Sequence, residues 1–319
     1  MTPEYNELAE NGYISASQSE LMRNPESKNA EWLKESENME SSELQFNVQE
    51  AMKSGVVISG ITGTGKTDLG MYLVDQLMKE GILAIVFDSS QDWQNRSSIA
   101  QYETLTIPSI SAIPQSSIIF DISTLSVEQR QRLIERFSET LYRHQAMTPS
   151  KKQYFLVFEE GSSYFREGFM RGKRFSNTSM LMSEGRNYGV RFMVITQFFA
   201  SIDKMSMRYM RQRYFGSTNE PNDVDYIAKF FSRERKQEIG KTLRGLDVGS
   251  FLYMHGSETK RIHIEPYESQ IVKTEVRTSV PQCVPIEPIK CAHSENTTIA
   301  LARFGMLVFF GILFLRALI

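Results

Sequence analysis

The chain has 319 residues, 41% of them hydrophobic, so it can bury a sizeable core, and disorder throughout is excluded. Its net charge of −2 gives no general attraction to nucleic acid, although the first 47 residues hold ten Glu against three Lys or Arg. Two cysteines exclude a disulfide framework and favour an intracellular protein.

The chain begins with an arm and continues with a long stretch of mixed helices and strands. Residues 1–47 are rich in Ser, Asn and Glu, so we predict a disordered acidic arm, for which a protein partner is one open role. From about 48 to 266, short apolar runs alternate with helical stretches, which is typical of βαβ units. The sequence therefore predicts an α/β fold with a central, mainly parallel sheet flanked by helices. The expected strands are 55–60, 82–88, 117–122, 153–159 and 190–196, and the main expected helices are 66–80, 125–146 and 176–186.

A phosphate-binding motif, 60-GITGTGKT-67, follows the first expected strand and precedes a helix. Its glycines let the backbone curl so that N–H groups form an anion nest, which the helix N-terminus completes. Lys66 supplies a compact positive charge for the β- and γ-phosphates, and Thr67 supplies a hydroxyl for Mg²⁺. The motif predicts a P-loop for ATP and Mg²⁺. Its residues are Gly60, Thr62, Gly63, Thr64, Gly65, Lys66 and Thr67.

Two adjacent carboxylates, Glu159 and Glu160, end the expected strand at 153–159. One acid at such a strand end can hold the Mg²⁺ shell, and the next can polarise a water for in-line attack on the γ-phosphate. Related ATPases mostly have Asp in the first place. The longer Glu159 reaches a metal-bound water more readily than the ion itself. We predict Glu159 at the Mg²⁺ and Glu160 as the base, which favours hydrolysis.

A basic stretch, 166-REGFMRGKR-174, follows a few residues later with Phe169 among its charges. Such a loop can track DNA phosphates without reading bases, while a solvated basic loop is the alternative. The candidate DNA contacts are Arg171, Lys173 and Arg174.

The stretch 183-SEGRNYGVRFMVITQ-197 ends a short apolar run on a polar residue, Gln197. One interpretation is a core strand with an incidental polar end. The other starts from P-loop ATPases that carry an extra strand between the P-loop strand and the acidic strand. There the added strand ends beside the γ-phosphate with a polar sensor, and Gln197 would be that sensor. Its amide can donate to the phosphate and accept from the attacking water.

The last part of the chain differs from the rest. Residues 267–298 contain several prolines and polar residues and are predicted to be a linker. Residues 299–319 are apolar apart from Arg303 and Arg316, and they have about the length that crosses a bilayer. A transmembrane helix would place the body at the cytoplasmic face of a membrane. A helix lying in the interface or against a partner is the alternative.

Taken together, GITGTGKT, LVFEE and EGRNYGVRFMVITQ make the chain resemble the HerA/FtsK superfamily of ring-forming, DNA-pumping ATPases. The resemblance covers about 48–266, including VFDSSQDW at 86–93, where such proteins have a strand ending in Asp and an aromatic residue. It implies a RecA-like P-loop fold and a homo-oligomeric, hexameric ring. It also implies that Arg186, before the fifth strand, acts on the neighbouring subunit's ATP, with Arg213 as a second candidate.

Three functions are open at this point. The compact build resembles the genome-packaging ATPases of membrane-containing viruses, which implies a membrane-tethered motor that translocates double-stranded DNA. An ATPase that powers protein export or filament assembly, resembling type IV secretion and conjugation ATPases, is the second. A nucleotide-gated scaffold without hydrolysis is the third. Stimulation of turnover by DNA separates the first from the second.

Overall fold

The computed structural model describes residues 46–101, 112–148, 152–166, 176–231, 236–256, 258–268 and 283–285. The chain divides into two units, Met1–Val284 and Pro285–Ile319, and only Pro285 of the second is described, so the account concerns the first. The predictions for the acidic arm up to residue 45, for Arg171, Lys173 and Arg174, and for the apolar helix at 299–319 lie outside the described residues. Within the described ranges, no helix is both long and apolar enough to cross a membrane.

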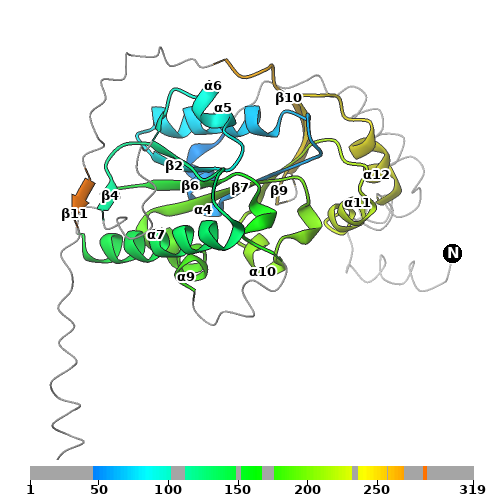
Figure 1. Cartoon of the computed structure of the whole chain (residues 1–319). Coiled ribbons are helices and arrows are strands. Elements are labelled where there is room, and N and C mark those ends of the chain that lie inside the picture. The colour runs from blue at the N-terminus through cyan, green and yellow to red at the C-terminus, as the bar shows by residue number, and fades with distance from the viewer. Residues whose placement is uncertain are drawn as a thin grey trace, which may run out of the picture. The chain divides into compact units, whose positions relative to one another are not determined.

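A nine-stranded sheet lies at the centre, in the order β10-β9-β8-β1-β7-β6-β2-β5-β3 (Figure 1). The strands from β8 to β3 in this order are parallel, and β9 and β10 are antiparallel to their neighbours. This arrangement confirms the predicted α/β fold with a mainly parallel sheet. The strands are β1 Val56–Ser59, β2 Leu83–Asp88, β3 Ala100–Gln101, β5 Ile118–Asp121, β6 Tyr154–Phe158, β7 Val190–Thr196, β8 Gln212–Phe215, β9 Ser250–His255 and β10 Glu258–His263; β4 Ala112–Pro114 and β11 Cys283–Pro285 form a separate pair.

Helices lie on both sides of the sheet, with α5 and α6 on one side and α7 and α9 on the other (Figure 1). The α-helices are α4 Val48–Ser54, α5 Lys66–Lys79, α6 Asp92–Arg96, α7 Val127–Met147, α9 Asn177–Glu184, α10 Lys204–Met207, α11 Pro221–Ala228 and α12 Lys236–Arg244, and the 3₁₀ turns are η2 Gly161–Ser163, η3 Gly185–Tyr188 and η4 Phe199–Ser201. The predicted helix at 176–186 thus ends at Glu184, and Arg186 lies on a 3₁₀ turn.

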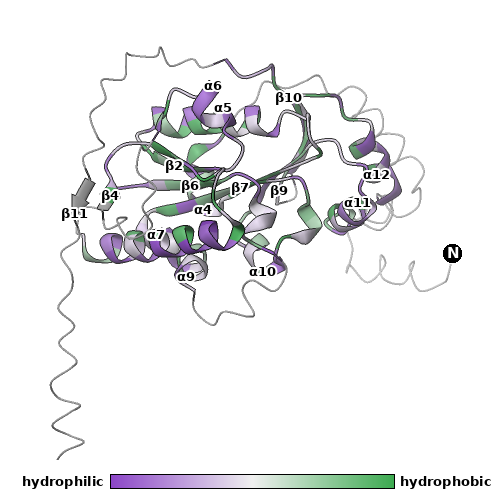
Figure 2. Ribbon diagram, in the orientation of Figure 1, coloured by the Kyte–Doolittle hydropathy of each residue, from purple (hydrophilic) through white to green (hydrophobic). Residues whose placement is uncertain are grey.

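The central strands are buried on both faces because helices cover both. Every residue of β1, β6 and β7 is buried, as their apolar runs predict for strands inside a parallel sheet. On the face away from α5, the rings of Phe192, Phe158, Phe87 and Phe120 stack in a row across β7, β6, β2 and β5. Phe137 of α7 covers the row edge-on. Figure 2 shows the same division, with hydrophobic strands inside and polar helix faces outside.

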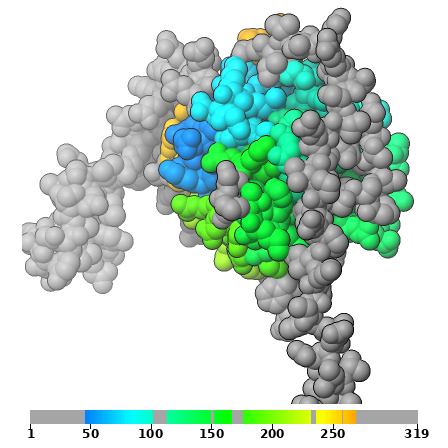
Figure 3. All heavy atoms as spheres, turned by 90° about the vertical axis from the view of Figure 1, so that its left-hand side faces the viewer, coloured from blue at the N-terminus to red at the C-terminus, as the bar shows by residue number. Residues whose placement is uncertain are grey.

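The short helix α4 joins the start of the body to the middle of the sheet. The Arg191 side chain is buried in β7, and its Nε donates to the Met52 carbonyl in α4 at 3.0 Å. Burial lowers the pKa of Arg191 to about 10, and the Arg186 charge acts in the same direction. The hydrogen bond from Arg191 to Met52 explains why a charged side chain is tolerated inside a core strand. In the space-filling view, blue residues near the start of the body lie beside green ones far along the chain (Figure 3).

Strands β8 to β10 were not predicted, and two of them are weak as sequence patterns. β8 reads QRYF, and β10, at the edge of the sheet, has exposed or half-buried residues at five of its six positions. The segment after β10 also belongs to the body. Tyr267 is buried, its hydroxyl donates to Asp75 of α5 at 2.8 Å, and its N–H donates to Asp68 at 2.9 Å. Tyr267, at the start of the predicted linker, therefore helps to hold the helix that follows the P-loop.

Candidate functional site

The order of the strands brings the predicted site residues to one edge of the sheet. β7 lies between β1 and β6, and Ser59 is in register with Thr196, while Phe158 is in register with Val194. Because these strands are parallel, the P-loop after β1, the acids after β6 and Gln197 after β7 all follow carboxyl ends. The extra strand expected between the P-loop strand and the acidic strand is confirmed.

The P-loop curls between β1 and α5 and leads directly into the first turn of α5. Gly65 has a φ of 88°, a left-handed conformation that a glycine adopts readily, and α5 begins at the next residue. The first N–H groups of a helix lack intrahelical acceptors, so they point to where an anion would bind. Lys66 Nζ donates to the Ile61 carbonyl at 2.9 Å. Burial lowers the pKa of Lys66, whereas the carboxylates of Glu160 and Glu159 act in the opposite direction.

Glu159 lies against the first turn of α5, where its Oε1 accepts a hydrogen bond from Thr67 Oγ1 at 3.1 Å. The residue is only 4% exposed, and burial raises the pKa of Glu159 to about 7, while hydrogen bonds from Trp93 and Thr67 act to lower it. A hydroxyl and a carboxylate within hydrogen-bonding distance are oxygen donors of the kind that Mg²⁺ prefers. With the anion cradle beside them, these residues fit a magnesium nucleotide.

Glu160, Gln197 and Thr62 form a chain of hydrogen bonds across the same edge. Gln197 Nε2 donates to Glu160 Oε1 at 2.7 Å, and Gln197 Oε1 accepts from Thr62 Oγ1 at 3.1 Å. Glu160 has a φ of 53°, so the backbone turns sharply after β6 and directs this side chain differently from Glu159. The predicted base and the predicted sensor are thus in direct contact, and the sensor also reaches the P-loop.

The two candidate arginines differ in position. Arg186 is exposed and precedes the amino end of β7, so about 20 Å of strand separates it from the P-loop edge of its own chain. Arg213 is half-buried in β8, with its guanidinium 4.2 Å from the Phe230 ring centre. Burial lowers the pKa of Arg213. Arg213 thus stacks on Phe230 within its own chain, whereas Arg186 lies away from the P-loop edge of its own chain.

Sequence reasoning missed two residues that contact the site. Trp93 donates a hydrogen bond to Glu159, and Gly249 donates its N–H to the Thr64 carbonyl of the P-loop at 3.1 Å. The aromatic residue after β2 was noticed only as part of a resemblance, without a partner. No signal in the sequence indicated Gly249, because its contact joins segments far apart in the chain.

Gly249→Ala should destabilise the protein and weaken nucleotide binding. Gly249 has a φ of 78°, and a Cβ there would lie 2.4 Å from the Ile264 carbonyl oxygen, so strain and overlap add up to about 2–4 kcal/mol. The loss is measured by denaturant unfolding. Gly256→Ala is the matched control, because Gly256 has a φ of 60° but nothing within 4 Å of its added Cβ. Equal losses in the two variants would contradict the role of the close approach.

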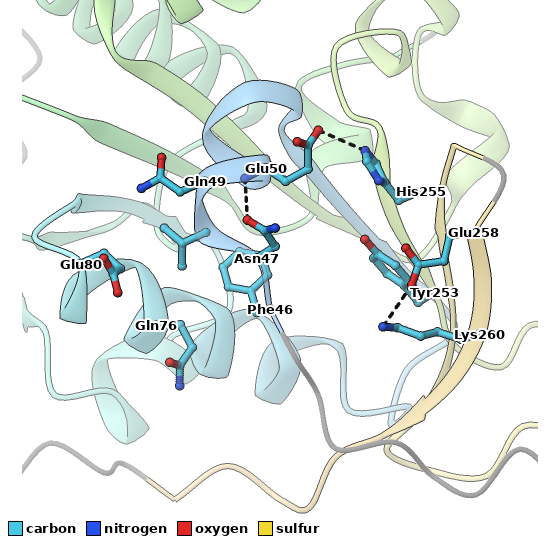
Figure 4. A pocket seen from close by; sticks show the side chains of 11 residues that line it. Phe46, Asn47, Gln49, Glu50, Gln76, Glu80, Tyr253, His255, Glu258 and Lys260 are labelled. Carbon is cyan, nitrogen blue, oxygen red and sulfur yellow. Dashed lines mark hydrogen bonds and ion pairs between the residues drawn. The ribbon is translucent and has the colours of Figure 1, made fainter.

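A separate hollow of about 710 Å³ lies beside the far end of α5, between α4 and the β9–β10 hairpin (Figure 4). His255 Nε2 lies 3.2 Å from Glu50 Oε1 there, and Lys260 pairs with Glu258 at 3.3 Å. No P-loop residue lines it, and its charged groups are largely paired with one another. The hollow is therefore not the nucleotide site.

Comparisons with known proteins agree with this geometry at the level of fold. No protein-family model and no curated protein matches the chain. The genome packaging NTPase B204 from Sulfolobus turreted icosahedral virus 2, in complex with sulfate, matches with a TM-score of 0.52 and 16% identity, over 68% of this chain and 99% of that one. Its complex with ATP-gammaS gives 0.51 and 16%, over 67% and 98%.

The bacterial conjugative coupling protein TrwB matches with a TM-score of 0.51 and 10% identity, over 75% of this chain and 93% of that one. At identities this low, the structural matches show a shared fold and nothing more specific. The resemblance predicted from the sequence is confirmed at that level, because a genome packaging NTPase and a conjugative coupling protein have this fold. This chain has the fold of the genome-packaging and conjugative-coupling P-loop ATPases.

Proposed function

We propose that this protein is an ATP-hydrolysing ring motor that translocates double-stranded DNA, for genome packaging or DNA transfer. One observation carries the proposal: Lys66, Thr67, Glu159, Glu160 and Gln197 meet at a single sheet edge, with the base and the sensor in hydrogen-bonding contact. The similar structures include a genome packaging NTPase bound to ATP-gammaS and a conjugative coupling protein, which supports the same class of motor.

Each residue has a distinct part in the proposed hydrolysis. Lys66 and the N–H groups of the P-loop bind the β- and γ-phosphates, and Thr67 with Glu159 holds Mg²⁺. When bound, the Mg²⁺ ion neutralises charge that develops on the phosphate oxygens. Glu160 accepts a proton from the attacking water, and Gln197 orients that water and contacts the γ-phosphate. The bond between Gln197 and Glu160 then links the presence of a γ-phosphate to the position of the base.

The proposed assembly is a homo-oligomeric ring, hexameric by resemblance. Arg186 lies at the opposite end of β7 from the site of its own chain, so it suits a role in the neighbouring subunit's site. There a guanidinium stabilises the charge of the transition state. The basic residues Arg171, Lys173 and Arg174 are proposed to contact DNA phosphates.

Residues 299–319 are proposed to tether the motor to the cytoplasmic face of a membrane. The acidic arm at 1–47 is proposed to bind a protein partner. Flotation with lipid vesicles tests the tether, since full-length protein should float and a chain ending at residue 298 should not.

Double-stranded DNA should raise ATP turnover of the purified full-length protein several-fold. Contacts to phosphates release counterions, so the stimulation should weaken strongly between about 50 and 200 mM salt. Turnover is measured by phosphate release at both salt concentrations, with Lys66→Ala as the inactive control. Intact turnover that ignores DNA would favour the protein-export ATPase, and binding of ATP without turnover would favour the scaffold.

A further inference from the structure

Glu159 is held from two sides by side-chain donors, one of them fully buried. Its Oε1 accepts from Thr67 Oγ1 at 3.1 Å, and its Oε2 accepts from the indole Nε1 of Trp93 at 2.9 Å. The Trp93 side chain is fully buried, and an indole N–H can only donate. One carboxylate oxygen is therefore committed to Trp93, and the other faces the first turn of α5. The orientation of the carboxylate is set by this pair of bonds.

The backbone of Trp93 is fixed by the turn that follows β2. Asp88 Oδ2 accepts the backbone N–H of Trp93 at 3.1 Å, and Asp88 Oδ1 accepts the backbone N–H groups of Ser90 and Gln91, each at 3.0 Å. Gln91 has a φ of 68°, a left-handed conformation within this turn, and Trp93 two residues later is buried. Asp88 is completely buried and supports Trp93 without contacting Glu159 in any hydrogen bond that the described structure shows.

The other side of the indole packs against α5. A Cβ on Gly70 would lie 3.3 Å from Cζ2 of Trp93, so the ring rests almost on the helix backbone. Helix α5, which carries Lys66 and Thr67, and helix α6, which carries Trp93, thus meet around Glu159. With its backbone held by Asp88 and its ring packed on Gly70, the buried Trp93 directs its indole N–H toward Glu159.

A glutamate at this position needs such a restraint. Its side chain has one more rotatable bond than aspartate, and an unrestrained carboxylate would lose more entropy when it engages a ligand. Donors that hold metal-binding carboxylates in one orientation commonly affect metal affinity by about 10- to 100-fold. The bond from Trp93 restrains the extra torsion in advance.

We propose that Trp93 is a positioning residue that orients Glu159 for the magnesium nucleotide, with Asp88 holding Trp93 in place. The inference rests on the proposed ATPase function, and it assigns a purpose to the segment 88-DSSQDW-93. Trp93 itself contacts neither the nucleotide nor the reacting water. Its effect passes entirely through the second oxygen of Glu159.

Trp93→Phe keeps an aromatic ring and removes the N–H. Calorimetric titration measures the affinity for ATP-gammaS with Mg²⁺ and in EDTA. In EDTA the variant should bind ATP-gammaS as the unaltered protein does. The increase in affinity on adding Mg²⁺ should be about tenfold or more smaller in the variant than in the unaltered protein. Tyr154→Phe, in strand β6, is the matched control, because it also removes one buried aromatic donor. The Tyr154 hydroxyl donates to the Pro114 carbonyl at 3.2 Å. The control should lose stability to a similar degree and keep its full response to Mg²⁺.

Fluorescence gives a second measurement that does not require the Trp93 variant to fold. Trp93 is one of two tryptophans, so Trp32→Phe leaves it as the only one in the full-length chain. Its emission should change when Mg²⁺ is added to the complex with ATP-gammaS, and ATP-gammaS in EDTA should leave it unchanged.

The outcomes separate the two claims. If Mg²⁺ raises the affinity for ATP-gammaS equally in Trp93→Phe and in the unaltered protein, the role of Trp93 is overturned. Trp93 emission that does not change on adding Mg²⁺ would overturn it as well. Failure of the unaltered protein to bind ATP-gammaS under any condition would instead overturn the proposed function.

Discussion

Glu160→Gln should abolish ATP turnover and leave ATP binding intact. An amide cannot take up the proton of the attacking water, so we expect a loss of about 10²- to 10⁴-fold in turnover. The substitution keeps the size of the side chain, and the amide oxygen can still accept the bond from Gln197 Nε2, now 2.7 Å long. Phosphate release measures turnover, and calorimetric titration with ATP-gammaS measures binding.

Glu80→Gln serves as the control for Glu160→Gln. Glu80 is exposed at the far end of α5, so the same chemical change there should alter neither turnover nor binding. Unchanged turnover in Glu160→Gln would remove Glu160 as the base. A variant that no longer binds ATP-gammaS would show that Glu160 acts in binding instead.

Arg186→Ala should lower turnover by about 10³-fold or more and should be rescued by mixing with Glu160→Gln subunits. The reason is geometric, because Arg186 lies at the amino end of β7 and Glu160 at the carboxyl edge of the sheet. In a mixed ring, a subunit that carries Arg186→Ala keeps its own Glu160 and receives an arginine from its Glu160→Gln neighbour. Turnover of the mixture should therefore exceed that of either variant alone.

A mixture of Glu160→Gln with Lys66→Ala is the matched control for this rescue. Both changes damage the site of the subunit that carries them, so neither subunit can repair the other. The control mixture should stay inactive. Absence of rescue in the Arg186→Ala mixture would contradict a role across the subunit interface. Rescue in both mixtures would show that the recovered turnover comes from contamination, and it would also contradict the role assigned to Arg186.

Local residue patterns were enough to predict the P-loop and the strands that carry the site. The motif 60-GITGTGKT-67 sets its own backbone through glycines and the helix that follows, and the apolar runs at 153–159 and 190–196 are typical of strands buried inside a parallel sheet. Because parallel strands end at one edge, the sequence also placed Glu159, Glu160 and Gln197 near the P-loop.

Contacts between residues that are far apart in the sequence could be identified only from the tertiary structure. Gln197 could have ended its strand without touching anything, and its bonds to Glu160 and Thr62 depend on β7 lying between β1 and β6. The same holds for Trp93, whose N–H reaches a carboxylate 66 residues further along the chain. Periodicity reports which face of an element is buried, not which element covers it.

By itself, the sequence determined a P-loop, a mainly parallel α/β sheet and the acids at its edge, because each follows from short-range patterns of apolar residues, glycines and charges. The resemblance to known ATPases added Gln197. The tertiary structure decided how these parts act together. It directs Trp93 and Thr67 onto different oxygens of Glu159, joins Gln197 to Glu160 and separates Arg186 from the P-loop edge of its own chain by the length of β7. These are contacts between distant segments, and packing of the whole sheet and its helices sets them.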